Sequence, residues 1–228
     1  MNTCSVAPAP AWFVTGTDTE IGKTFSCCAL LHVLRNRGVC AVGMKPIAAG
    51  VDAQGRNEDV DALMAASAVA APRALVNPYL FEAAIAPHIA AAAQGRSIEL
   101  APILSAFNAL RAMAGAVLVE GVGGFCVPLG PDTDTVDLAR ALGLPVILVV
   151  GMRLGCINHA LLSQQAIAAS GLTLAGWIAN RIDPHMACFE ENLAALEARI
   201  AAPLLGVIAA HSTPQSAAKG LQLPVFQP

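Results

Sequence analysis

A glycine-containing loop near the amino terminus constrains this chain more than any other feature. The apolar run Trp12-Phe13-Val14 leads into residues 16–24, with the sequence Gly-Thr-Asp-Thr-Glu-Ile-Gly-Lys-Thr, and a helical pattern follows directly. A loop between a strand and a helix points backbone N–H groups and the positive end of the helix dipole at an anion. This order of features predicts a phosphate-binding loop rather than an ordinary turn with a solvated lysine.

Three residues of this loop suit phosphate groups and their metal ion. Gly22 lets the backbone approach the phosphates, Lys23 reaches the β- and γ-phosphate oxygens, and the Thr24 hydroxyl is a ligand for Mg²⁺. The spacing departs from the common motif G-x-x-x-x-G-K-[ST]. Here five residues separate Gly16 from Gly22, and Thr17 stands at the position of the first glycine.

The composition indicates a single folded α/β domain over residues 1–228, with residues 1–11 expected to be flexible. Hydrophobic residues make up 56% of the chain and charged residues 13%, so it can bury enough apolar surface to offset the entropy of ordering. An intrinsically disordered protein is therefore excluded. The formal net charge is −3, which lacks the clustered basic charge of a nucleic-acid-binding protein.

Neither a membrane span nor a leader is expected. The longest stretch without Asp, Glu, Lys or Arg, residues 154–180, contains polar residues such as Asn158, His159 and Gln164. Residues 1–12 lack the basic start and apolar run of a signal peptide. The seven cysteines form no C-x-x-C pair and show no zinc spacing. We expect a cytoplasmic protein with reduced, mostly buried thiols and no membrane partner.

Apolar runs alternate with helical patterns along the chain. Strands are predicted at residues 12–14, 39–44, 116–119, 145–150, 172–179 and 204–208, and helices at 25–34, 59–70, 103–113, 158–169 and 189–200. Residues 72–102 contain four prolines and are expected to be irregular with short helical pieces. Repeated strand–helix–strand order predicts a mostly parallel sheet with helices on both faces, in which ligands bind beyond the carboxyl ends of the strands.

Charged residues follow two of these strands. Lys45 directly follows the second strand and is either a fixed cation for an anionic substrate or an ordinary surface lysine. Glu120 ends the third strand, where an acid costs free energy unless it is paired or bound to a metal. We therefore regard Glu120 as a candidate Mg²⁺ ligand. The glycines Gly121, Gly123 and Gly124 after it would let a ligand lie against the backbone.

Two further segments are open to more than one interpretation. Residues 57–61, Asn-Glu-Asp-Val-Asp, are either an acidic helix start or, beside a phosphate loop, the source of one Mg²⁺ partner. Asn180 follows the fifth strand and is either a turn residue or a hydrogen-bonding partner for adenine. The histidines His88 and His159 are more typical of structural residues than of catalytic ones.

Taken together, these motifs resemble one enzyme family, the dethiobiotin synthetases, from about Trp12 to Gly206. The segments that carry the resemblance are residues 14–24, Lys45-Pro46, Asn77-Pro78-Tyr79, Ala86-Pro87-His88, residues 119–124 and residues 155–159. The extra residue in the phosphate loop is normal for that family. The resemblance implies a P-loop NTPase type of fold and an ATP-dependent cyclising carboxylase of biotin biosynthesis.

The resemblance also implies the substrates, steps and assembly. They are 7,8-diaminononanoate, CO₂ or bicarbonate, and ATP with Mg²⁺, and the products are dethiobiotin, ADP and phosphate. An amine captures CO₂ as a carbamate, the carbamate oxygen attacks the γ-phosphoryl group, and the second amine closes the ring with loss of phosphate. The family works as a homodimer in which the carboxylate end of the substrate reaches the partner chain near residues 155–158.

Residue roles follow from the same resemblance. The implied catalytic residues are Lys45, Lys23 and Thr19. The implied Mg²⁺ ligands are Thr24, Asp59 and Glu120, with Asp61 as the alternative to Asp59. The implied nucleotide-binding residues are Glu20, Ile21, Gly22, Lys23, Thr24, Phe25, Asp59, Glu120, Gly121, Gly123, Gly124, Asn180 and Arg181.

The chain departs from the family pattern at two places. Ala49 stands where the family often has a serine, and the missing hydroxyl is expected to weaken substrate binding by roughly 1 kcal/mol unless water replaces it. Ala209-Ala210-His211 stands where the family often has Pro-Trp-Leu, so looser adenine packing is expected. The sequence fits two other functions less well. A glutamine-dependent ligase needs a further domain, for which this chain is too short. A partition-type ATPase carries an additional lysine early in the loop, where this chain has Gly16 and Thr17.

Overall fold

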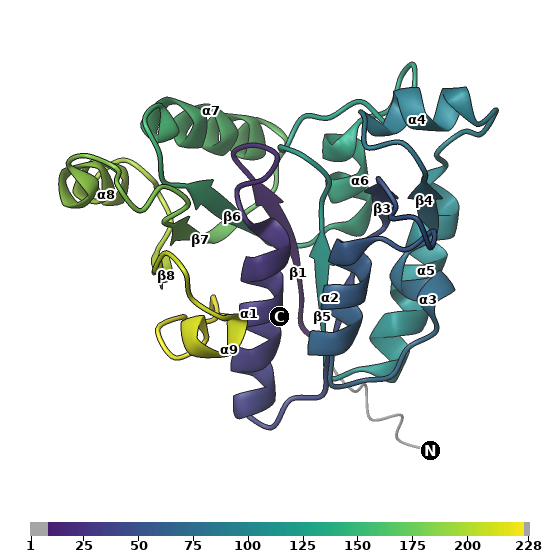
Figure 1. Cartoon of the computed structure of the whole chain (residues 1–228), viewed down its shortest axis with the longest axis horizontal. Coiled ribbons are helices and arrows are strands. Elements are labelled where there is room, and N and C mark those ends of the chain that lie inside the picture. Colours follow the sequence, from purple (N-terminus) through teal and green to yellow (C-terminus); the bar gives the residue numbers. More distant parts are fainter. Residues whose placement is uncertain (1–8, 226–228) are drawn as a thin grey trace.

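Six parallel strands form the central sheet, in the order β2-β5-β1-β6-β7-β8 (Figure 1). The structure is a computed structural model that describes residues 9–225. The strands are β1 (Ala11–Gly16), β2 (Ala41–Met44), β5 (Ala116–Glu120), β6 (Val146–Gly151), β7 (Leu174–Asn180) and β8 (Leu204–Ile208). The predicted fold class, a mostly parallel α/β sheet with helices on both faces, is confirmed.

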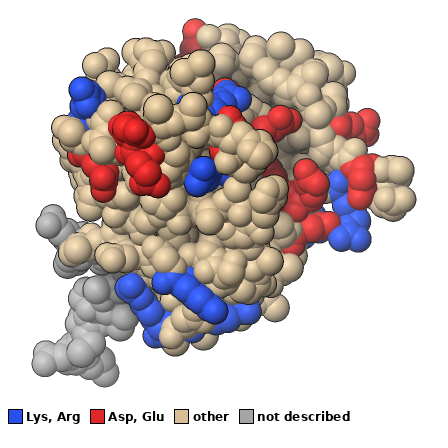
Figure 2. All heavy atoms as spheres, turned by 60° about the vertical axis from the view of Figure 1, so that its left-hand side comes forward, with Lys and Arg blue, Asp and Glu red and all other residues tan. Residues whose placement is uncertain are grey.

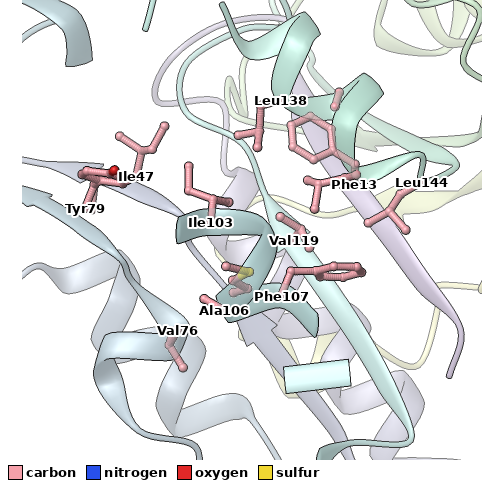
Figure 3. Packing of buried hydrophobic residues seen from close by; sticks show 14 of the residues in the cluster. Phe13, Ile47, Val76, Tyr79, Ile103, Ala106, Phe107, Val119, Leu138 and Leu144 are labelled. Carbon is pink, nitrogen blue, oxygen red and sulfur yellow. The ribbon is translucent and has the colours of Figure 1, made fainter. Parts of the chain in front are cut away.

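The central strands are buried on both faces, which explains why they are apolar almost without interruption. Along β1 every residue is buried, and successive side chains point to opposite faces of the sheet. Trp12 and Val14 belong to the core cluster on one face, and Phe13 belongs to the cluster on the other. Figure 3 shows Phe107 and Ile103 of a covering helix close to Val119 of β5.

Helices cover both faces of this sheet. Their bounds are α1 (Lys23–Asn36), α2 (Glu58–Ala66), α3 (Arg73–Val76), α4 (Pro87–Ala93), α5 (Leu100–Met113), α6 (Thr135–Leu142), α7 (Cys156–Ala169), α8 (Phe189–Glu197) and α9 (Pro214–Ala217). Buried residues of α1 and α9 pack together on one face, and those of α5 and α6 pack on the other. In Figure 1, α1 and α9 lie in front of the sheet.

The segment 72–102 is more regular than its prolines suggest. It contains α3, α4 and the short strand β4 (Tyr79–Phe81), which pairs in parallel with β3 (Ile47–Ala49) to form a second sheet of two strands. Helix α5 begins at Leu100 and so includes Pro102 in its first turn, where the missing N–H removes no intrahelical hydrogen bond. The expectation of an irregular segment was therefore wrong for β4 and for the start of α5.

Two helices and several boundaries also differ from the expectation. Helix α6 was not predicted, although Asp134 and Asp137 form a capping box at its start and Gly143 ends it in a left-handed conformation. Helix α9 was not predicted either. The strand expected at residues 39–44 begins at Ala41, and the helix expected at 59–70 already ends at Ala66.

Other predictions concern the ends and the cysteines. Most of the segment 1–11, expected to be flexible, lies outside the described residues, and Ala11 is the first residue of β1. Among the described residues six cysteines are free and three of these, Cys40, Cys126 and Cys188, are exposed, so the expected burial holds for only half of them. No helix within residues 9–225 has both the length and the apolar character that crossing a bilayer requires.

The burial of two methionines predicts that replacing them changes the free energy of unfolding by very different amounts. Met44 at the end of β2 is fully buried, and Met113 at the end of α5 is 46% exposed. We expect Met44→Ala to lower the free energy of unfolding by about 2–5 kcal/mol, because it leaves a cavity in the core. The matched control Met113→Ala should stay within about 0.5 kcal/mol of the unsubstituted protein. Equal midpoints of the two variants in urea unfolding would contradict this account of the core.

Candidate active site

The loop of residues 16–24 connects β1 to α1 and requires glycine at one position. Gly22 has a φ of +83° at the start of α1, and a Cβ atom there would lie 2.2 Å from Nδ2 of Asn180. Both the left-handed backbone and the neighbouring amide therefore exclude a larger residue. Glu20 also has a positive φ, of 58°, which is uncommon for a residue with a side chain.

Lys23 lies inside this loop rather than in solvent. It is buried, and its Nζ donates a hydrogen bond of 2.7 Å to the carbonyl oxygen of Asp18. Burial and the nearby charge of Lys45 lower the pKa of Lys23 to about 8. An anion in the loop would favour the charged form of this lysine. The side chain is thus placed where a phosphate group would interact with it most strongly.

Four residues from four elements meet beside the loop, and we call them the Lys45 cluster: Thr24, Lys45, Asp59 and Glu120. Lys45 follows β2, Glu120 ends β5, and the other two lie in the first turns of α1 and α2. Nζ of Lys45 is 3.1 Å from Oδ2 of Asp59 and contacts Oε1 of Glu120. The Thr24 hydroxyl donates to the same oxygen of Glu120 at 2.7 Å. The predicted strand-end residues are therefore brought together.

The charges of this cluster support one another. Burial alone would lower the pKa of Lys45, but the carboxylates of Glu120 and Asp59 outweigh it and raise the pKa above its ordinary value. Burial alone would raise the pKa of Asp59, but the charge of Lys45 and the hydrogen bond that Lys45 donates lower it. Lys45 and Asp59 therefore form an ion pair at neutral pH, and the interpretation of Lys45 as an ordinary surface lysine was wrong.

The structure separates the two aspartates that the sequence left open. Asp59 faces Lys45, whereas Asp61 is held by two arginines on the outside of α2. Oδ2 of Asp61 lies 2.6 Å from Nη2 of Arg56, and its Oδ1 contacts Arg73. Of the two, only Asp59 belongs to the Lys45 cluster.

The oxygen atoms of the cluster fit a hard divalent cation. Glu120 is 1% exposed, and its Oε2 is buried and accepts no hydrogen bond within residues 9–225. A buried carboxylate oxygen without a donor is costly, and a cation would remove that cost. Within the same residues, no three His, Cys, Asp or Glu side chains are grouped to hold a metal by themselves. Two carboxylates and a hydroxyl suit Mg²⁺, which also binds substrate phosphates.

The other predicted residues line the same loop. Thr19 and Glu20 are exposed on it, and a Cβ atom at Gly123 would lie 3.6 Å from Oγ1 of Thr19. A Cβ at Gly124 would lie 3.7 Å from the carbonyl oxygen of Gly16. The segment after β5 therefore runs beside the phosphate loop, as expected from the parallel sheet. Gly121 packs against the ring of Phe13, where a Cβ would lie 3.0 Å from Cζ.

Asn180 is the last residue of β7 and not part of a turn. It is buried, and its Nδ2 donates a 2.8 Å hydrogen bond to the carbonyl oxygen of Ile21. Its amide therefore supports the phosphate loop directly. Arg181 turns to the side, with its guanidinium carbon 4.6 Å from the centre of the Phe189 ring. Phe25 is partly buried and packs against the core of α1.

Sequence reasoning missed one pair of residues at this site. Oδ2 of Asp18 in the phosphate loop pairs with Nη2 of Arg153, which lies between β6 and α7. The two residues are 135 positions apart. No local pattern in a single sequence connects them, so only the three-dimensional structure identifies the pair.

Comparisons with known proteins show which family this chain resembles. A family model described as an AAA domain matches residues 11–214. The chain is 60% identical to the ATP-dependent dethiobiotin synthetase of Aromatoleum aromaticum, covering 94% of this chain and 97% of that protein. It is 53% identical to the protein of the same name from Janthinobacterium sp., covering 92% of both chains. For the one from Xylella fastidiosa strain 9a5c the identity is 56%, over 86% of this chain and 88% of that protein.

A solved structure shares the fold only. Chloroplast FtsY from Physcomitrella patens superposes with a TM-score of 0.53 at 16% sequence identity. The match covers 93% of this chain but 65% of that one, so this chain spans less than two thirds of that structure.

The buried ion pair predicts a specific pattern of stabilities. We expect Lys45→Met to lower the free energy of unfolding by about 3–5 kcal/mol, because it leaves buried Glu120 without its cation. Adding Glu120→Gln in that background should restore most of the loss. The control Arg56→Met removes a partner of Asp61 that is 63% exposed and should leave the free energy of unfolding nearly unchanged, because solvent screens exposed ion pairs. Urea unfolding measures all of these, and an absence of recovery in the double variant would contradict the pairing.

Proposed function

Because the chain belongs to the family of ATP-dependent dethiobiotin synthetases, ligases of biotin biosynthesis, we propose that its phosphate loop and Lys45 cluster carry out this reaction. The single observation that supports the assignment most is the meeting of Thr24, Lys45, Asp59 and Glu120 beside the loop that holds Lys23. The substrates we propose are 7,8-diaminononanoate, CO₂ or bicarbonate, and ATP. Dethiobiotin, ADP and phosphate are the products.

The proposed reaction has three steps. Fixed positive charge near the phosphate loop matters more to them than proton transfer. One amine of the substrate adds to CO₂ and loses a proton to give a carbamate. A carbamate oxygen then attacks the γ-phosphorus, and the bond to ADP breaks. Finally the second amine attacks the carbonyl carbon of the mixed anhydride and expels phosphate as the ring closes. Each step gathers negative charge near the loop, and fixed cations there lower the barrier.

The chain supplies these cations from two directions. Lys23 and the backbone N–H groups of residues 16–24 neutralise the transferring phosphoryl group. Lys45, kept charged by Glu120 and Asp59, faces the carbamate and the same phosphoryl group. Thr19, exposed at the tip of the loop, contacts the substrate beside Gly123.

Thr24, Asp59 and Glu120 would hold Mg²⁺, as the free oxygen of Glu120 suggests. When bound, this ion would neutralise charge on the β- and γ-phosphate oxygens. The nucleotide contacts that we propose come from four segments: Glu20, Ile21, Gly22, Lys23, Thr24 and Phe25; Asp59; Glu120, Gly121, Gly123 and Gly124; and Asn180 with Arg181. Asn180 would then hold the loop through Ile21 and contact adenine with its remaining amide atoms.

We also propose a homodimer in the cytoplasm. Two large apolar side chains are exposed at α7, Leu154 just before the helix at 95% and Leu162 in its middle at 55%, and a partner chain would cover them. No nucleic-acid or membrane partner is proposed. On the face in Figure 2, acidic and basic side chains form separate groups instead of one continuous basic surface. A demand for ATP and the six free cysteines among residues 9–225 support the cytoplasm as the compartment.

The reaction predicts strict coupling of ATP use to both other substrates. Purified protein should release phosphate from ATP only when diaminononanoate and bicarbonate are both present, and label from bicarbonate should enter a ureido product. Omitting either substrate is the control. Rapid ATP hydrolysis without them, or hydrolysis stimulated by DNA or lipid, would instead favour an ATPase switch.

Substitutions of the two aspartates of α2 should differ in their effect on the Mg²⁺ concentration that activity requires. Asp59→Asn should raise the Mg²⁺ concentration for half-maximal activity about tenfold or more, because it removes a charged metal ligand. Asp61→Asn is the matched control. It removes the same charge two residues away, from the arginine side of the helix, and should leave the Mg²⁺ requirement unchanged. The reverse result would assign the metal to Asp61.

A further inference from the structure

The phosphate loop carries a carboxylate where a triphosphate must bind. Asp18 is the third of residues 16–24, and its own charge opposes the binding of an anion. Its position is nevertheless built into the loop. Oδ1 accepts a 2.8 Å hydrogen bond from the backbone N–H of Thr19, and its carbonyl oxygen accepts the bond from Lys23. The side chain therefore shapes the loop while its charge works against the ligand.

Arg153 supplies the missing counter-charge. Its Nη2 lies 2.5 Å from Oδ2 of Asp18, the carboxylate oxygen that does not bond to Thr19. The two side chains are 43% and 44% exposed, so the pair sits at the mouth of the loop and not in the core. An arginine at this point cancels the charge of Asp18 without removing its hydrogen bond to the backbone.

The same arginine joins the phosphate loop to a second loop. Arg153 lies between the end of β6 and the start of α7, and its carbonyl oxygen accepts a 3.0 Å hydrogen bond from Cys156. Two more bonds join the phosphate loop to the end of β6, which leads into this second loop. The backbone N–H of Thr17 donates to Val149 at 3.0 Å, and that of Gly151 donates to Oγ1 of Thr17 at 3.3 Å. The ion pair of Arg153 with Asp18 is the charged contact among these three.

We propose that Arg153 is a positioning residue for ATP, which neutralises Asp18 and holds the phosphate loop against the segment that begins α7. It acts through Asp18 and does not touch the reacting atoms. This inference rests on the proposed binding of ATP to residues 16–24. It accounts for a carboxylate in a phosphate loop, which the chemistry of the reaction leaves unexplained.

The test compares single and double variants in nucleotide affinity and turnover. We expect Arg153→Ala to raise the KM for ATP about threefold to tenfold and to change kcat by no more than about twofold. A rise of this size lies between the effect of losing an exposed ion pair and that of losing a charged hydrogen bond. The Kd of a fluorescent ATP analogue with Mg²⁺ should rise equally. Arg153→Lys should restore most of the affinity, and Arg140→Ala on α6 is the control for loss of an exposed arginine.

Adding Asp18→Asn to Arg153→Ala distinguishes two roles of Arg153: neutralising the charge of Asp18 and holding the phosphate loop in place. Asparagine keeps the oxygen that bonds Thr19 but carries no charge, so the double variant should regain nearly normal affinity. An unchanged KM in Arg153→Ala, a double variant as weak as the single one, or a fall in kcat alone would each overturn the proposal. If the unsubstituted protein bound no nucleotide, or Lys23→Gln bound it equally well, the proposed function itself would fall.

Discussion

A buried lysine held between two carboxylates is the interaction on which the site depends. Lys45 is 4% exposed and Glu120 1%, and charges at such depth are tolerated only when they are paired. The pairing fixes the ends of β2 and β5 and the first turn of α2 relative to one another, and the Thr24 hydroxyl adds α1. The same charges that hold the four elements in place supply the cation and oxygen atoms that a phosphoryl transfer needs.

The order of the strands places this cluster beside the phosphate loop. Strand β1 lies between β5 and β6, and Val14 pairs in register with Glu120. The carboxyl ends of β5 and β1 therefore open at one edge, and the loops that follow them run side by side. Strand β7 contributes from further along the same edge, where Asn180 holds Ile21. The parallel sheet thus delivers side chains from distant parts of the chain to one small volume.

The sequence predicted the parts of the site that depend on strand ends, and missed those that depend on contacts between loops and short elements. Lys45 and Glu120 were identifiable because charged residues directly follow apolar strands. Asp59 and Asp61 were not distinguishable, since the side of α2 that faces Arg56 and Arg73 is set only when the chain folds. The sheet of β3 and β4 was missed because three-residue strands carry almost no periodicity. Arg153 escaped notice because its partner is far away in sequence.

The most direct test of this account is a structure determined with Mg²⁺ and a non-hydrolysable ATP analogue. The account predicts that the triphosphate lies on the backbone N–H groups of residues 16–24 beside Lys23, and that the metal is bound by Thr24, Asp59 and Glu120. A nucleotide bound at another place, or a loop closed by its own backbone while the Lys45 cluster stays intact, would contradict it.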